Sequence, residues 1–214
     1  GASAFKECSN LISVTLGNSV TTIGSNAFSN CSGLTSISIP KSVTYIGYCA
    51  FDGCSGLTAF HISDVGSWCN INFDYNRDQP SFLLTDPLTF APHHIYLNGE
   101  VLEELVIPDG VTSINDCAFF QCTDLTSVII PSSVTNIGNY AFYGCNKLIS
   151  VTIPNQATSI GNYAFYKCTR LISLSIGNSV QAIGDGAFAY CSGISSMIIP
   201  NGVTSIGNEA FFRC

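Results

Sequence analysis

Apolar residues recur along the chain at a spacing that predicts short strands. In the segment LTSVIIP, residues 125–131, the positions of Leu125, Val128 and Ile130 match the buried side of one strand. The segment is rich in β-branched residues, which favour strands. Pro131 ends it, because proline lacks the N–H group that a sheet ladder needs. Val134 then begins a return segment whose apolar residues are predicted to face inward.

The same pattern recurs in steps of 23 residues within two blocks of the chain. The unit is L-x-x-I-x-I-P-x-x-V-x-x-I-G-x-x-A-F-x-x-C-x-x. One such unit cannot bury its own apolar side, whereas stacked units bury each other, with parallel strands about 4.8 Å apart. The Ala-Phe pair and the Cys three residues after it mark the copies, with Phe at positions 5, 28, 51, 119, 142, 165, 188 and 211.

Three parts of the unit carry specific expectations. The segment around Ala-Phe is too short for an independent helix, so we expect one helical or 3₁₀ turn that places Ala against the wall and Phe in the core. The glycine four residues before this Phe indicates either positive φ or a close backbone approach. In one unit Asn115 replaces this glycine, and Asn tolerates the left-handed region well.

With its A-F-x-x-C signature, the unit resembles the BspA-type leucine-rich repeat of bacterial and protist cell-surface proteins. The resemblance covers residues 1–62 and 102–214 in register. It implies a curved leucine-rich-repeat solenoid of nine to ten rungs, with a parallel β-sheet on one face and short helical or 3₁₀ turns opposite. It also implies an extracellular or cell-surface location and adhesion to host matrix proteins or other microbes.

Residues 63–101 interrupt the regular pattern. Trp68 and Phe73 keep the spacing of Ile46 and Phe51, which predicts Trp68 at an Ile position and Phe73 at the core Phe position. Residues 74–94 show no repeat and contain three prolines, so they are predicted to leave the solenoid. Asn98-Gly99 between apolar runs predicts a type I′ hairpin. We therefore expect a single solenoid over residues 1–214, with degenerate repeats and an insert at 63–101, as a fragment of a longer array.

Charge restricts the class of partner. Only 10% of the residues are charged, against roughly 25% in globular proteins, and the net charge is −7. Nucleic acid is therefore not an expected partner. The chain has no apolar run of about 18 residues, so no membrane span is predicted. Ten of the fourteen acidic residues lie between Asp64 and Asp124, which predicts either a solvated face or a site for a cation or a cationic partner. The candidate residues for such a site are Glu100, Glu103, Glu104 and Asp109.

The eleven cysteines are predicted to be free thiols. Eight occupy one repeat position and should form a buried ladder. Stacked equivalents place their Cβ atoms about 4.8 Å apart, whereas a disulfide needs about 3.8 Å. Cys49 and Cys117 share a second position three rungs apart, and Cys69 stands alone. No C-x₂-C pair occurs, so no metal site and no cofactor are predicted.

Catalytic motifs are absent from the sequence. It contains no G-x-S-x-G, H-E-x-x-H or phosphate-binding glycine loop. The three histidines, His61, His93 and His94, could come together near the insert, but we expect surface histidines beside a turn. A metal- or His-dependent hydrolase is thus the third hypothesis, and no catalytic residue is assigned.

The outward-facing strand positions form the largest regular surface, and solenoids commonly bind along such a surface. The first hypothesis is a non-catalytic binding module for a host matrix protein, another microbial surface protein or a glycan. The second is a structural spacer that presents another domain. Uncapped end repeats are also expected to associate end to end. The predicted partner-binding residues are His61, Phe82, Phe90, Tyr96, Glu104, Val106 and Ile129.

Overall fold

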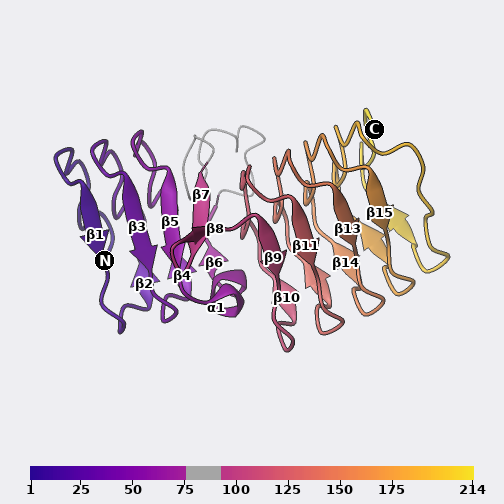
Figure 1. The fold of residues 1–214 in the computed structure, drawn as a ribbon, viewed down its shortest axis with the longest axis horizontal. Helices are drawn as coiled ribbons and strands as arrows, with labels where there is room; N and C mark the ends of the chain where they lie inside the picture. The colour runs from indigo at the N-terminus through magenta and orange to yellow at the C-terminus, as the bar shows by residue number, and fades with distance from the viewer. Residues whose placement is uncertain (76–92) are drawn as a thin grey trace. The chain divides into compact units, whose positions relative to one another are not determined.

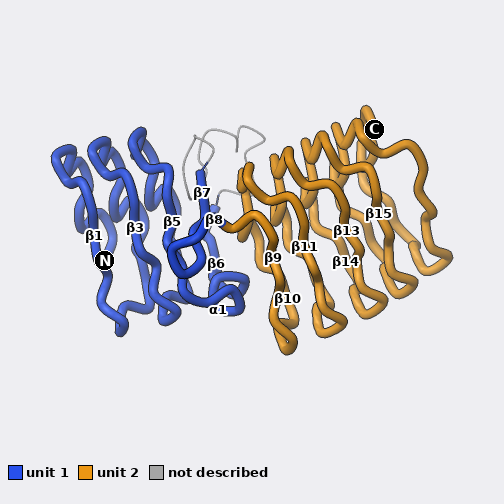
Figure 2. Tube along the Cα trace, viewed as in Figure 1, with its two compact units in different colours: residues 1–101 blue, residues 102–214 orange. Residues whose placement is uncertain are grey.

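The computed structural model describes residues 1–75 and 93–214 (Figure 1). The chain forms two compact units, Gly1–Val101 and Leu102–Cys214 (Figure 2). The boundary between them falls where the sequence predicted the end of the interrupted stretch. Phe82 and Phe90, two of the predicted binding residues, lie outside the described residues.

Unit 1 contains two ladders of strands. The first has the order β1-β3-β5-β7, all parallel, with β8 added antiparallel to β7, and the second is β2-β4-β6. Asn98 and Gly99 between β7 and β8 both have positive φ, at 52° and 95°, which confirms the predicted type I′ hairpin. The elements are β1 (Ser13–Thr15), β2 (Thr22–Ile23), β3 (Ser36–Ile39), β4 (Tyr45–Ile46), β5 (Ala59–Ile62), α1 (Val65–Cys69), β6 (Asn72–Phe73), β7 (His94–Leu97) and β8 (Glu100–Val101).

Unit 2 repeats this arrangement without interruption. One parallel ladder is β9-β11-β13-β15 and the other is β10-β12-β14-β16-β17 (Figure 1). Neighbouring strands pair at the same repeat position, so that Val128 lies opposite Leu105 and Val151 opposite Leu174. The elements are β9 (Glu104–Val106), β10 (Ser113–Ile114), β11 (Ser127–Ile129), β12 (Asn136–Ile137), β13 (Ser150–Thr152), β14 (Ser159–Ile160), β15 (Ser173–Ser175), β16 (Ala182–Ile183) and β17 (Ser205–Ile206).

A column of stacked phenylalanines fills the core of unit 2. The ring of Phe165 lies between those of Phe142 and Phe188, with centroid distances of 5.1 and 5.2 Å and nearly parallel planes. All three side chains are fully buried. The repeat step places one such ring on each rung, and the predicted core position of Phe is confirmed.

The side opposite the strands consists of short turns with 3₁₀-type hydrogen bonds, such as that from the N–H of Tyr143 to the carbonyl of Tyr140, and contains no continuous helix among the described residues of the regular rungs. Each rung has two left-handed residues here, for example Tyr140 with φ 58° and Gly144 with φ 73°. Their main-chain N–H groups donate to Asn162 and Tyr166 on the next rung. In a helix these groups would donate along the helix itself. The left-handed residues therefore join successive rungs by hydrogen bonds. Among the described residues only α1 is helical.

The repeat glycine serves close packing between rungs. A Cβ at Gly161 would lie 2.5 Å from the main-chain nitrogen of Asn139. Its φ is not positive, so the close-approach explanation holds. Asn115 does not adopt the left-handed conformation either. The left-handed residues come two positions later in each rung.

Side-chain oxygens after this glycine link the rungs of unit 2. The Oδ1 atom of Asn139 accepts a hydrogen bond of 2.7 Å from the main-chain N–H of Asn162. The Oδ1 atom of Asn162 accepts one of 2.8 Å from Asp185. Each side chain thus satisfies a donor that the turn would otherwise leave open.

All eleven cysteines are free, as predicted, and nine are buried. The thiol of Cys168 donates to the carbonyl oxygen of Phe142, 3.3 Å away on the preceding rung. Cys145 and Cys191 donate in the same way to Phe119 and Phe165. The ladder therefore consists of thiol–carbonyl bonds between rungs and contains no disulfide.

Thiol labelling should count the buried cysteines. Burial raises the pKa of Cys54 to about 11 and that of Cys69 to about 12. The thiolate is the reactive form, so these groups react slowly in the folded chain. We expect iodoacetamide at pH 8 to modify the two exposed cysteines, Cys8 and Cys214, in the native chain, and all eleven after unfolding. Mass spectrometry checks this, and rapid native labelling of Cys168 would contradict it.

The predicted register of the interrupted stretch is wrong. Phe73 pairs with Ile46, so it occupies the Ile position and not that of the core Phe. Trp68 lies in α1 and is 1% exposed. A helix advances only 1.5 Å per residue, whereas a strand advances about 3.3 Å. The residues of α1 therefore lengthen this rung and shift the apolar positions that follow.

The number of rungs is also lower than expected. The chain forms about eight turns, against the predicted nine to ten. Among the described residues, the ladders β1-β3-β5-β7 and β9-β11-β13-β15 contain eight parallel strands, since residues 194–200 form no strand beside β15.

Candidate functional site

A groove on unit 1 lies where β1, β3 and β5 end and the β7–β8 turn begins. Its volume is about 310 Å³. Among the residues that the structure describes, no Asp, Glu, Lys or Arg lines it. We call it the His61 groove, and the polar residues and glycine that line it include Thr15, Ser38, His61, Ser63, Asn98 and Gly99.

The repeat itself produces one wall of the His61 groove. Thr15, Ser38 and His61 occupy the same position on successive strands, in direct register. This position faces away from the core, because side chains alternate along a strand. His61 pairs in turn with Tyr96 on β7. The hairpin turn at Asn98 supplies the other wall.

His61 and Tyr96 form the aromatic part of this site. Their rings stack with centroids 4.8 Å apart and an interplanar angle of 26°. Both are half-buried, so part of each ring remains accessible. Stacked rings beside hydroxyl and amide groups suit a neutral polar ligand, such as a peptide or a glycan.

An apolar pair lies on the strand face of unit 2. Val106 and Ile129 stand opposite each other in register and are 57% and 62% exposed. Glu104 is exposed on the same strand as Val106. The structure thus brings Glu104, Val106 and Ile129 together in unit 2, and His61 and Tyr96 together in unit 1.

The expectation that all three histidines lie at the surface is wrong for His93. Its side chain is 0% exposed and its ring packs against Phe60 at 5.2 Å. His93 directly precedes β7, where Ile95 pairs with the inward-facing Phe60 of β5. His94 lies at the edge of Tyr96, 6.4 Å between centroids. This placement does not favour the hydrolase hypothesis, because a buried imidazole does not meet a substrate at the surface.

The acidic residues do not form a metal site in the described parts of the chain. Glu100, Glu103, Glu104 and Asp109 are all exposed. Within residues 1–75 and 93–214, no group of three His, Cys, Asp or Glu side chains is placed to hold a metal ion. No helix among these residues has the length and apolar character needed to cross a membrane.

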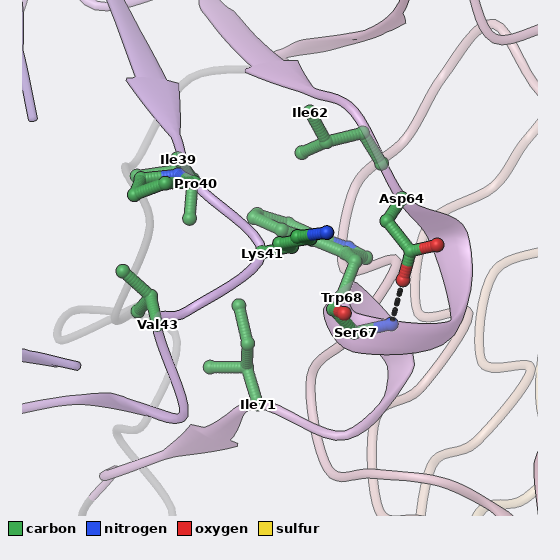
Figure 3. A pocket seen from close by; sticks show the side chains of 9 residues that line it. All are labelled: Ile39, Pro40, Lys41, Val43, Ile62, Asp64, Ser67, Trp68 and Ile71. Carbon is green, nitrogen blue, oxygen red and sulfur yellow. Dashed lines mark hydrogen bonds between the residues drawn. The ribbon is translucent and has the colours of Figure 1, made fainter. Parts of the chain in front are cut away.

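A second cavity in unit 1, beside α1, is too small for a ligand (Figure 3). Its volume is about 10 Å³, enough for a single water at most. Asp64 begins the helix there, and its carboxylate accepts a 2.6 Å bond from the N–H of Ser67. Hydrogen bonds from the side chain of Ser67 and then from its main-chain N–H lower the pKa of Asp64. The apolar walls, including Trp68 and Ile71, mark this place as core.

Sequence reasoning missed a second exposed apolar column. Ile12, Ile149 and Ile172 follow the first Leu of their units and are 67%, 40% and 61% exposed. The signal was available, because other units carry threonine at this position, at Thr35, Thr58 and Thr126. A position held by threonine in several rungs faces solvent.

The BspA type Leucine rich repeat region matches residues 1–85 and 91–214 in six copies. The chain belongs to this family. No curated protein matches the chain in sequence. The family assignment confirms the resemblance that the A-F-x-x-C unit indicated.

Several solved structures of leucine-rich repeat proteins are similar to this chain. The T. pallidum leucine-rich repeat protein is 27% identical with a TM-score of 0.47, covering 92% of this chain and 73% of its own. A leucine-rich cell-surface protein from Faecalibacterium prausnitzii is 29% identical with a TM-score of 0.47, covering 94% and 45%. The pneumococcal vaccine antigen PcpA is 19% identical with a TM-score of 0.53, covering 91% and 58%, and supports the fold alone.

Proposed function

We propose that the chain is a non-catalytic binding module of a cell-surface protein that adheres to a protein or glycan partner. The observation that carries this proposal is the outward strand face of each unit. Unit 1 presents the His61 groove, and unit 2 presents the apolar pair of Val106 and Ile129. Membership of the BspA-type family supports it, since the resemblance implied surface adhesion.

The two surfaces differ in what they offer a partner. The His61 groove provides stacking rings and uncharged hydrogen-bonding groups, which match neutral polar ligands. Val106 and Ile129 provide exposed apolar area, which gains free energy when a protein partner removes it from water. We therefore assign glycan or peptide recognition to unit 1 and protein contact to unit 2.

A spacer that holds another domain is the alternative function. The turn side of unit 2 favours it, because rungs joined by turn hydrogen bonds and stacked aromatic rings make a cohesive array. A spacer needs no partner and tolerates changes on the strand face.

Binding to a panel of extracellular matrix proteins and glycans tests the proposal. Two double variants use residues found at the same repeat position elsewhere: His61→Ser with Tyr96→Thr, and Val106→Thr with Ile129→Thr. Truncating the few residues that dominate an interface costs about 2 kcal/mol or more, so if these pairs are the contact centres we expect the affinity to fall about tenfold or more. Surface plasmon resonance with the purified chain measures it.

The matched control is Thr169→Ala, an exposed residue on the turn side of unit 2. It should leave the affinity unchanged. A variant with residues 74–94 replaced by a short loop tests whether the insert takes part. The absence of any partner, or a partner indifferent to both double variants, would favour the spacer.

A further inference from the structure

A second groove lies on unit 2, between β15 and the chain segment that follows it one rung later. Its volume is about 470 Å³. In Figure 1 the yellow stretch beyond β15 runs apart from that strand. We call it the β15 groove, and its apolar lining includes Ile172, Leu174, Ile176, Met197, Ile198 and Pro200.

The separation is confined to the strand side of the last rung. On the return side, Thr204 still donates to the carbonyl of Gln181, at 2.8 Å. On the turn side, Phe188 donates to Ala210 at 2.7 Å. Within unit 2 as described, no main-chain hydrogen bond joins residues 194–200 to β15. The return and turn sides of the last rung are therefore hydrogen-bonded to the rung before it, whereas residues 194–200 are separated from β15.

One edge of β15 consequently offers main-chain groups to the groove. Ser173 and Ser175 bond to β13, through the N–H of Ser173 to Ile149 and the carbonyl of Ser175 from Ile153. In a parallel ladder, successive residues direct their main-chain groups to opposite edges. The N–H and C=O of Leu174 therefore face the β15 groove. An unpaired edge of this kind is a template for another strand.

A repeat position whose side chain is buried in other rungs is partly exposed to solvent at the β15 groove. Val151 is 2% exposed, whereas Leu174 and Met197, at the same repeat position, are only half-buried. Ile172 and Ile198 flank the groove and are 61% and 83% exposed. The described residues that line the groove include no charged side chain. An occupant therefore needs apolar side chains, and a charged one would lose hydration without a counter-charge.

We propose that the β15 groove binds an extended, uncharged peptide segment of a partner protein, which adds to unit 2 as a β-strand. Main-chain hydrogen bonds to Leu174 provide affinity, and apolar side chains between Leu174 and Met197 provide selectivity. β15 is three residues long, so the segment that it recognises directly is short. The site shares no residue with the His61 groove, so its failure would leave the proposed function standing.

A peptide from the chain itself tests this proposal. LISVTIPN, residues 148–155, contains β13, the strand that pairs with β15 on its other edge. We expect the fluorescein-labelled peptide to bind the full chain saturably in fluorescence anisotropy. Two further peptides carry N-methyl groups on alternate residues, one on the odd-numbered and the other on the even-numbered positions. Each peptide therefore lacks the N–H donors along one of its two edges. One should lose at least tenfold in affinity and the other should not, because only one set of N–H groups faces β15.

Matched variants place the binding at the groove. Ile172→Thr with Ile198→Thr introduces residues found at the same positions in Thr126 and Thr152, so the fold should persist. We expect about a tenfold loss of affinity for the peptide. Ile149→Thr, an exposed residue of the same column that does not line the groove, should bind like the wild type. Circular dichroism verifies folding of all three chains.

Three outcomes would overturn the proposal. The first is no saturable binding, or equal binding of a scrambled peptide. The second is equal binding of both N-methylated forms or of the double variant. The third is a wild-type dimer in analytical ultracentrifugation that the double variant abolishes and the peptide does not dissociate, which would assign the groove to a second copy of the chain.

Discussion

Replacing Phe165 by alanine is expected to lower the free energy of unfolding by about 3–5 kcal/mol. The ring is fully buried and stacked on both sides, at 5.1 Å from Phe142 and 5.2 Å from Phe188. Its removal leaves a cavity that the neighbouring rungs cannot close, because hydrogen bonds along the turn side hold them at a fixed spacing. Urea unfolding followed by circular dichroism measures the effect.

Phe5→Ala is the matched control for this substitution. Phe5 occupies the same repeat position but is 41% exposed and stacks on Phe28 alone. It should cost much less, about 1 kcal/mol, since a large part of its area is already in water. Equal losses at Phe5 and Phe165 would mean that the stacked column does not determine the stability of the array.

The regular rungs could be predicted because each apolar position recurs every 23 residues. Strand register, the phenylalanine column and the free thiols all follow from that repetition. The exposed pair of Val106 and Ile129 follows too, since side chains alternate along a strand. Repetition therefore fixes both the core and the outward face.

The departures occur where repetition stops or where conformation depends on neighbours. Trp68 and Phe73 keep the repeat spacing in sequence, yet α1 changes the advance per residue and shifts their register. The turn side is not helical because left-handed residues such as Tyr163 direct N–H groups to the next rung. Residues 194–200 match the strand pattern, and only the structure shows the groove beside β15. These are tertiary effects that a single unit does not encode.

Raising the pH above 9 is expected to destabilise unit 2 steeply. Burial raises the pKa of Cys145 and Cys168 well above the ordinary thiol value of 9.0. In the unfolded chain these thiols lose their protons near pH 9, whereas the folded chain retains them. The unfolded state then binds fewer protons, so stability is unaffected below about pH 9 and falls as the pH rises further. Each retained proton contributes about 1.4 kcal/mol per pH unit, or about 3 kcal/mol per pH unit for the two thiols.

The tyrosines of unit 2 steepen this loss at higher pH. Burial also raises the pKa of Tyr140 and Tyr143 above the ordinary value of 10.0, so their contribution begins about one pH unit later. Urea unfolding at pH 8 to 11 under reducing conditions measures the slope of the free energy of unfolding against pH.

Cysteine variants separate the thiol contribution from general alkaline effects. Cys145→Ala should reduce the loss of stability between pH 9 and 10 by about 1 kcal/mol, because one retained proton is removed and the unfolded thiol is only partly ionised over this range. Cys8→Ala, at the same repeat position but exposed, controls for the loss of a cysteine as such. A slope that Cys145→Ala leaves unchanged would show that the buried thiol ladder is not what limits stability in alkali. A reduced slope would identify the buried thiols, which donate hydrogen bonds between rungs, as groups that must stay protonated for the array to remain folded.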